Sequence, residues 1–542
     1  NMKYLLTVVD IANEYLNGDK TTDYGNSEYA TLAAADTVAT NTAIDTLVKA
    51  PPFTITTTPN TSSFGMIIGA AGNFTIDWGD GQSEVITDKP IRTTRYSHTY
   101  TTSGEYEIKL TGRATDYSDA KVDIDTGANW VPAFALNDAI SGAFRATNVA
   151  KISGGLGRVF PTMDDGSNPN FAFAFAYAPI TEIPADLFDG ISGAPTHAMF
   201  FSTFAYTAIT SIPADLFGTL NGDGAPSMFA QTFSECPNLT TIDGPLFSGT
   251  LTPAEGMFGS TFSSTALTEI PADLFAGVQG APAESMFSWT FSDTAITEIP
   301  ADLFAGIQGA PADSMFSWTF AGTAITEIPA NLFAGIQGAP ADSMFTRTFS
   351  STAITSIPAD LFAGIQGVPA DRMFYGTFSS TAITEIPADL FAGIRGAPAV
   401  EMFYATFSYT DITEIPADLF AGIQGAPARS MFYSTFQNAA ITSIPDGLFA
   451  GIQGAPAERM FTYTFSSTDI TSIPENLFAG ISGPAATDMF GRTFADCYSL
   501  TGPSARTNGQ YLYEIWPDVS RMYTYRNATG LSDYDQIPDG WK

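Results

Sequence analysis

Hydrophobic and polar positions repeat every 29 residues along most of this chain. The unit at residues 295–323 reads AITEIPADLFAGIQGAPADSMFSWTFAGT, and its Met-Phe pair occurs eleven times between Met199 and Met489 without a change of spacing. A fixed period of about 20–50 residues indicates stacked supersecondary units, none of which can bury its apolar face alone. The pattern therefore predicts a solenoid, a class of protein that usually works by presenting an extended surface.

Within one unit, the pattern predicts a short strand followed by short helices. Ile296 and Ile299 flank a polar pair, and Pro300 cannot donate to a ladder, so a strand of about three residues is expected there. Residues 300–307 combine a Pro-Ala-Asp helix start with apolar residues on one face, and residues 311–320 repeat this arrangement. We therefore expect an α/β solenoid of parallel strands and short helices, with Ile, Leu, Phe and Met in a continuous core.

The period changes before the repeats begin. Residues 51–115 contain short alternating runs broken by Gly, Asp-Gly and Pro, which predict a small antiparallel β-sandwich. Residues 116–170 fit a linker and a degenerate capping repeat, residues 171–500 the solenoid, and residues 501–542 a C-terminal capping repeat. Residues 1–50 start with an amphipathic helix pattern. Its apolar face would pack internally or would attach the chain to another subunit or a larger assembly.

The composition narrows the classes of partner. The chain has 22 Lys and Arg against 56 Asp and Glu, a formal net charge of −34. This charge argues against binding to nucleic acid and to anionic lipid, and no apolar run is long enough to cross a membrane. The N-terminus lacks a standard secretory signal. Either a signal was removed or the protein leaves its cell by another route, such as within a virion.

The two cysteines, Cys236 and Cys497, are too few for a disulfide framework. They lie nine repeats apart, about 40 Å at the roughly 4.8 Å spacing of parallel strands. A disulfide tolerates a separation of only roughly 7 Å. Both cysteines are therefore expected to be free and buried.

A specific motif marks the predicted sandwich. The residues Trp78-Gly79-Asp80-Gly81 and His98-Thr99-Tyr100, followed by Gly104, Tyr106 and Leu110, closely resemble the PKD domain family. Members of this family are extracellular, immunoglobulin-like modules that act mainly as spacers or adhesive units. The resemblance implies that Asp80-Gly81 forms a tight turn, that Trp78 and Tyr106 lie in the core, and that His98 is a framework residue.

The repeats carry a second resemblance. Their I-T-E-I-P, L-F, M-F and T-F anchors, with CPNLTTI at 236–242 and CYSLT at 497–501, resemble BspA-type leucine-rich repeats and related bacterial surface-protein repeats. The likeness covers roughly residues 135–542. Adhesins, host-protein binders and phage-borne fibres use repeats of this class, which implies an extracellular or cell-surface location. Most copies here depart from the family by having Thr at the usual Cys position and by a two-proline layout.

Candidate binding residues lie where the repeats differ. The two residues after each Met-Phe pair vary in a way that core positions do not tolerate, so they should face solvent. Trp, Tyr and Arg in one exposed band are favoured in recognition surfaces. The alternative interpretation is that surface positions simply vary. The candidates are Trp289, Trp318, Arg347, Tyr375, Tyr404, Tyr433, Tyr463 and Arg492.

The sequence was also searched for metal-binding, catalytic and cofactor-binding residues. Carboxylates one strand apart repel unless screened or bridged, so calcium between Glu298 and Glu327 is a candidate, although a solvated acidic face is the favoured interpretation. The two histidines, His98 and His197, fall in different predicted domains. No nucleophile elbow, metal-ligand spacing or phosphate loop occurs. We therefore expect neither an enzyme nor a dedicated cofactor.

These observations predict a non-enzymatic, extracellular adhesion or recognition protein. Its partner would be a protein or a glycan on a cell surface. Two alternatives are left open. One is a virion fibre or decoration protein held through residues 1–50, and the other is a structural subunit that assembles into a filament or sheath.

Overall fold

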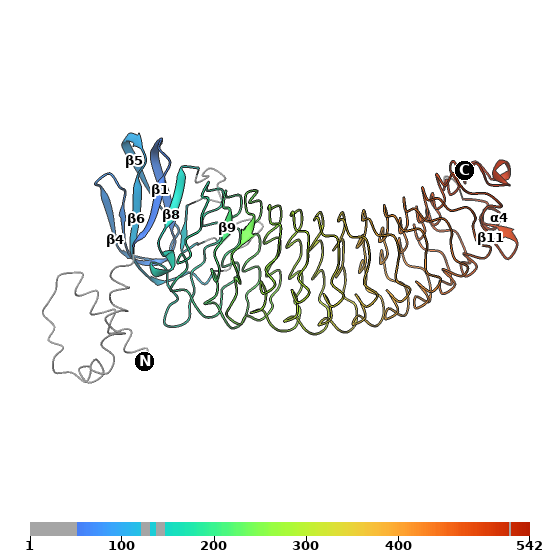
Figure 1. Cartoon of the computed structure of the whole chain (residues 1–542), viewed down its shortest axis with the longest axis horizontal. Coiled ribbons are helices and arrows are strands. Elements are labelled where there is room, and N and C mark those ends of the chain that lie inside the picture. Colours follow the sequence, from blue (N-terminus) through green and yellow to red (C-terminus); the bar gives the residue numbers. More distant parts are fainter. Residues whose placement is uncertain (1–50, 121–130, 137–146, 520–521) are drawn as a thin grey trace.

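The computed structural model describes residues 51–120, 131–136, 147–519 and 522–542. Figure 1 shows an elongated, gently curved molecule with strands β1 to β8 at one end and a long row of stacked turns of chain running to the C-terminus. The predicted attachment segment, residues 1–50, lies outside the described residues. Part of the predicted N-terminal capping repeat, residues 137–146, lies outside them too.

The first part of the chain forms two antiparallel sheets. The strands are β1 (Phe53–Thr57), β2 (Thr61–Ile68), β3 (Ala71–Asp77), β4 (Ser83–Lys89), β5 (Thr94–Gly104), β6 (Glu107–Asp116), β7 (Phe134–Ala135) and β8 (Val149–Ser153). One sheet has the order β4-β3-β6-β1-β8 and the other β5-β2-β7. Alternate residues of β1 are buried, as expected for a strand with one face on a core. Across the two sheets, the rings of Phe53 and Phe134 lie 5.5 Å apart in an edge-to-face contact.

Strand β8 joins these sheets to the repeats. It pairs antiparallel with β1, with Ile152 opposite Ile55. Just beyond it, the ring of Phe160 lies 5.6 Å from Phe74 in the sheets and 6.3 Å from Phe171 at the start of the repeats. The sheets and the repeats therefore share one hydrophobic core.

The predicted α/β solenoid with short helices, and with it the leucine-rich-repeat classification, is wrong. Among the described residues, the helices are α4 (Leu512–Ile515) and the 3₁₀ turns η2 (Leu156–Arg158) and η3 (Tyr534–Gln536), all outside residues 171–500. The predicted strands are missing from most repeats. The described repeats contain one parallel pair of two-residue strands, β9 (Ser211–Ile212) and β10 (Thr241–Ile242), and an antiparallel pair, β11 (Arg506–Thr507) and β12 (Gln510–Tyr511), lies near the C-terminus. Regular structure in the described chain is almost entirely β-strand.

Each 29-residue repeat instead forms a coil of tight turns and segments without turns, the longest of which is residues 294–300 at the start of the unit above. In residues 283–293, every second N–H donates within its own turn, as from Ser288 to the Ser285 carbonyl (3.1 Å). The N–H groups between them donate to the next coil, as from Phe287 to the Met315 carbonyl (2.9 Å). All nine N–H groups from 285 to 293 are paired in this way, which satisfies the backbone as fully as a helix would.

Short helices were wrongly predicted from the sequence because these turns have a period of four residues. Ser285, Trp289 and Asp293 all have φ between 53° and 60°, and each marks the third position of a turn that requires positive φ. Two residues then point inward and two outward in alternation, so Met286 and Phe287 are buried. Over so short a segment, a period of 4 cannot be told from the roughly 3.6 residues of a helix.

The Pro-Ala-Asp segment after each extended stretch is also a pair of turns. Leu303 donates to the Pro300 carbonyl (3.1 Å), a three-residue step in place of the four-residue step of a helix. A Cβ at Gly306 would lie 2.3 Å from the Val278 carbonyl of the preceding coil, so only glycine allows this approach. Isolated parallel bridges then connect the coils, as between Gly280 and Ile307.

Three columns of stacked phenylalanine rings fill the coil array. One column follows the Met-Phe pair, with the ring of Phe316 lying 5.8 Å from Phe287 and 6.0 Å from Phe345 in nearly parallel planes. The Thr-Phe and Leu-Phe positions form the other two columns, as in Phe291–Phe320 and Phe304–Phe333. Near the C-terminus, Tyr525 stacks on Phe494, and the buried Trp541 lies beyond it.

Candidate functional site

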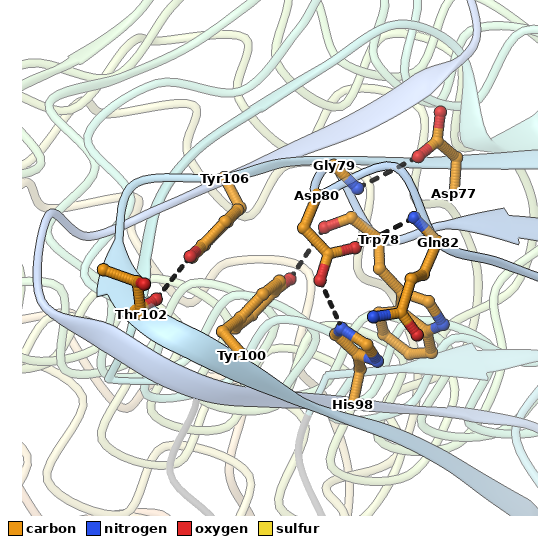
Figure 2. Close-up of polar contacts among 9 residues, drawn as sticks. All are labelled: Asp77, Trp78, Gly79, Asp80, Gln82, His98, Tyr100, Thr102 and Tyr106. Carbon is orange, nitrogen blue, oxygen red and sulfur yellow. Dashed lines mark hydrogen bonds and ion pairs between the residues drawn. The ribbon is translucent and has the colours of Figure 1, made fainter.

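The polar cluster at the PKD-like motif is a framework for the sheets. Figure 2 shows His98 pointing at Asp80, with His98 Nε2 2.8 Å from Asp80 Oδ2. This hydrogen bond lowers the pKa of the Asp80 carboxyl, which also accepts the Gln82 N–H at 3.0 Å and so fixes the turn. The His98 ring stacks on the buried Trp78 at 5.2 Å, and Tyr100 donates to the Trp78 carbonyl at 2.9 Å.

The polar contacts of this cluster fix the turn between β3 and β4, connect it to β5, and close the junction of β5 and β6. Tyr106, half-buried, stacks on Tyr100 with ring centroids 3.6 Å apart and donates its hydroxyl to the Thr102 carbonyl. The Asp80 carboxylate contacts both the His98 ring and the Gln82 N–H, so it links β5 to the turn between β3 and β4. The arrangement agrees with framework roles for Trp78 and His98.

The eight predicted ligand-binding residues form one continuous column on the outside of the array, which we call the outer stack. The set is Trp289, Trp318, Arg347, Tyr375, Tyr404, Tyr433, Tyr463 and Arg492. Three pairs of neighbouring rings lie face to face, 4.2 Å apart for Trp289–Trp318, 4.4 Å for Tyr375–Tyr404 and 4.5 Å for Tyr404–Tyr433, with interplanar angles below 10°. The rings of Tyr433 and Tyr463 are also in contact, with centroids 5.7 Å apart, but their planes are tilted by 58°. The sequence predicted the members of this surface, but not that they would stack on one another.

Guanidinium groups continue the stack where rings are missing. Arg347 lies over Trp318 at 4.6 Å and over Tyr375 at 5.7 Å. Arg492 lies over Tyr463 at 5.4 Å and donates to its hydroxyl. Such cation–π contacts contribute about 0.5–2 kcal/mol each, depending on how far the cation is desolvated.

Each coil has two outward positions here, and one large side chain occupies them together with a small one. The large residue is second in Ser288-Trp289, but it is first in Tyr375-Gly376. A Cβ at Gly376 would lie 3.0 Å from Cγ of Arg347, so a small residue there leaves room for the arginine. The column therefore shifts by one residue between Arg347 and Tyr375, and the array still presents a single ladder.

The stacking of these side chains on one another determines which of their atoms a partner can reach. The ring faces cover one another, so the ladder presents ring edges and polar tips to solvent over most of its length. Burial between its neighbours raises the pKa of Tyr404. A tyrosine phenol is protonated at neutral pH even without this shift, so the Tyr404 hydroxyl can donate a hydrogen bond. The preformed order of these side chains lowers the entropy that a partner must remove on binding.

Polar columns flank the outer stack on both sides. On one side, Glu401 accepts a hydrogen bond from Arg372 at 2.6 Å and forms an ion pair with Arg429 at 3.2 Å, each pair joining adjacent coils. On the other side lie small polar residues such as Ser351 and Ser380. An aromatic centre with a polar rim is the usual anatomy of a recognition surface. The sequence did not predict these ion pairs, because the two positions before each Met-Phe pair hold different residues from one repeat to the next.

The remaining predicted sites show no convergent chemistry. Glu298 and Glu327 are exposed, and no group of three His, Cys, Asp or Glu able to hold a metal ion occurs in the described part of the chain. Calcium binding therefore stays a prediction. Both cysteines are free and buried, and Cys236 lies 3.2 Å from the Thr207 hydroxyl. Burial raises the pKa of the Cys236 thiol to about 11, which makes it a poor nucleophile.

Comparison of the chain with known protein families and with curated proteins gives no match. The resemblances to PKD domains and to bacterial surface-protein repeats therefore stay predictions, apart from the leucine-rich-repeat fold that the second resemblance implied, which is wrong because the described repeats of residues 171–500 contain no helices. Within the described residues, no helix has the length and apolar character needed to span a membrane.

Proposed function

We propose that this chain is a non-enzymatic recognition protein that binds a partner through the outer stack. The observation that carries the proposal is the unbroken column of Trp, Tyr and Arg on an array whose interior hardly varies. Eight coils contribute to it, and one large side chain comes from each. Stacking at these outward positions also adds stability, but Trp, Tyr and Arg are the residue types favoured at the centre of recognition surfaces.

The geometry favours a protein partner over a glycan along most of the ladder. Sugars commonly bind to the faces of aromatic rings, and here the faces of rings such as Trp318 and Tyr404 are covered by their neighbours. Ring edges, phenol hydroxyls and guanidinium groups remain available, and these suit the hydrogen bonds and packing of a protein surface. The PKD-like motif supports an extracellular location for this binding. Attachment through residues 1–50, as in a virion fibre, concerns a segment outside the described residues.

The test replaces Trp289, Trp318 and Tyr375 together by serine in the full chain and measures binding to a peptide array and a glycan array. The matched control replaces Gln279, Gln308 and Gln366, exposed residues of the same three coils, by serine. The proposal predicts that the stack variant loses at least about tenfold in affinity for its arrayed ligands while the control keeps wild-type binding. Equal binding by both variants would show that recognition lies elsewhere.

A further inference from the structure

The outer stack has one open end, at Trp289. One face of this indole covers Trp318 at 4.2 Å. The opposite face looks toward the preceding coil, whose outward positions hold only Gly259 and Ser260. The hydrogen bond from the Ser260 N–H to the Ser288 carbonyl (2.8 Å) sets these two coils side by side. Within the described chain this face has no ring or guanidinium partner, and Trp289 is 38% exposed.

The coil that precedes Gly259 and Ser260 does not fill the space beside this face of Trp289. Its outward position holds Gln231, but the Gln231 amide oxygen accepts a hydrogen bond from the Ser202 hydroxyl at 3.0 Å. Ser202 lies on the far side of Gln231 from Trp289, so this contact draws the glutamine away from the indole. A planar group that extends the stack by one step would therefore meet the small surface of Gly259 and Ser260 beneath it.

The array itself shows which group fits beside an indole. One coil beyond Trp318, at the same position of the repeat, Arg347 places its guanidinium 4.6 Å from the indole centroid. Ser260 stands one coil before Trp289 at that same position of the repeat. The backbone conformations also agree, with φ of 53° at Ser260 and 51° at Arg347. The space beside the open face of Trp289 therefore matches the position that the Arg347 guanidinium occupies beside Trp318.

The charge around Trp289 favours a cation. Residues 159–346 contain no Lys or Arg and 19 Asp and Glu. Two of these acids, Glu255 and Glu284, are exposed on the two coils that border the open face. A negative surface raises the local concentration of cations and speeds their association. This stretch therefore supplies no Lys or Arg that could stack on the Trp289 indole.

From these observations we propose that the open face of Trp289 binds an arginine side chain of a partner protein, with the guanidinium extending the outer stack. The inference rests on the proposed recognition function and specifies its anchor. Arginine is favoured over lysine because its planar guanidinium stacks on a ring, whereas an ammonium is a compact and strongly hydrated charge.

The experiment compares immobilised Gly-Arg, Gly-Lys and Gly-citrulline repeat peptides of equal length, binding to the full chain at physiological ionic strength. The lysine peptide measures general attraction to the acidic surface, and the citrulline peptide keeps the shape of arginine without its charge. We expect wild-type protein to prefer the arginine peptide over the lysine peptide by about fivefold, the factor that corresponds to one exposed cation–π contact.

Two variants test the site itself. Trp289→Ser removes the indole, and Ser260→Arg supplies an internal arginine that fills the space beside its open face. Both should abolish the arginine preference and keep the general attraction, while Tyr498→Ser, at an exposed aromatic outside the stack, should leave the preference intact. A preference that survives in either test variant overturns the inference.

A glycan-array signal that both test variants lose, with unchanged peptide binding, overturns the inference as well, because it would assign the open face to a sugar. In either case the outer stack can still be the recognition surface. The proposed function itself fails only if replacing Trp289, Trp318 and Tyr375 together leaves all peptide and glycan binding unchanged.

Discussion

Replacing Phe316 by alanine tests how the coils hold together. This ring is fully buried in the middle of the array. It stacks on Phe287 and Phe345 in the two adjacent coils at 5.8 and 6.0 Å, and it packs at an angle on Phe304 and Phe333 at 4.9 and 4.6 Å. A single substitution therefore weakens two interfaces between coils and leaves a cavity at their centre.

The size of the effect follows from these contacts. Phe→Ala in a close-packed core costs about 3–5 kcal/mol, and aromatic pairs add roughly 0.5–1.5 kcal/mol each beyond area burial. Because Phe316 makes four such pairs, we expect the Phe316→Ala variant to lose about 5 kcal/mol of unfolding free energy, the upper end of the range for Phe→Ala. The four pair energies are not simply summed, because interactions within one cluster are not additive. In a stacked array, stability is approximately a sum of repeat and nearest-neighbour terms, so the loss should be concentrated in the coils around Phe316.

Urea unfolding followed by hydrogen exchange and mass spectrometry would measure both the size and the location of the loss. Trp318→Ser in the same coil is the control, and it should cost less than about 2 kcal/mol because that side chain is only half-buried. A loss below about 1 kcal/mol for Phe316→Ala, or equal losses for the two variants, would refute the reasoning that the phenylalanine columns hold the array together.

Three further predictions concern single groups. Thr319→Val should cost about 1 kcal/mol in urea unfolding, because the buried Thr319 hydroxyl donates to the Phe287 carbonyl of the preceding coil at 2.9 Å; Thr319→Ser, which keeps the hydroxyl, should restore that bond. Cys236 and Cys497 should react with a thiol reagent at pH 8 roughly a hundredfold more slowly than in denaturant, because both are buried with raised thiol pKa values; rapid native labelling would contradict this. Burial, with Arg92 nearby, lowers the pKa of Lys89 to about 8 from 10.5. The unfolded state therefore binds more protons between these values, and stability should rise from pH 8 to 9.5 in wild type but not in Lys89→Met.

The sequence predicted the period and the core positions well because both depend on which residues are apolar. Phe316 and Met315 recur at fixed spacing, and in the structure they are buried. The helices could not be predicted correctly from the same pattern. Four-residue turns and helical turns place apolar residues at i, i+1, i+4 and i+5 alike, and Pro-Ala-Asp serves a turn as readily as a helix start.

The turns also depend on an uncommon backbone conformation. Trp289 and Arg347 have φ of 60° and 51°, a region that bulky residues seldom adopt. No local preference of tryptophan or arginine indicates this conformation. It is stabilised by hydrogen bonds to the next coil, such as that from the Trp289 N–H to the Ser317 carbonyl (2.9 Å). Such hydrogen bonds form only when the coils are stacked, so the sequence of a single repeat does not reveal them.

The candidate site was predictable in its members and not in its geometry. Variation at the two positions after Met-Phe indicates that they face outward. Whether Trp318 and Tyr404 offer their faces or their edges depends on the spacing between coils and on the shift at Gly376, which a list of residues does not contain. That difference is the reason for proposing a protein packed against the ring edges as the partner, in place of a sugar stacked on the ring faces.

Hydroxyl-radical footprinting of the unmodified protein tests most directly whether the outer stack is closed along its length and open at one end. We predict rapid oxidation of Trp289, slower oxidation of Trp318, Tyr404 and Tyr433, and almost none of Phe316. If Trp318 and Tyr404 are oxidised as fast as Trp289, the rings do not cover one another, and the ladder on which the proposed recognition depends does not exist.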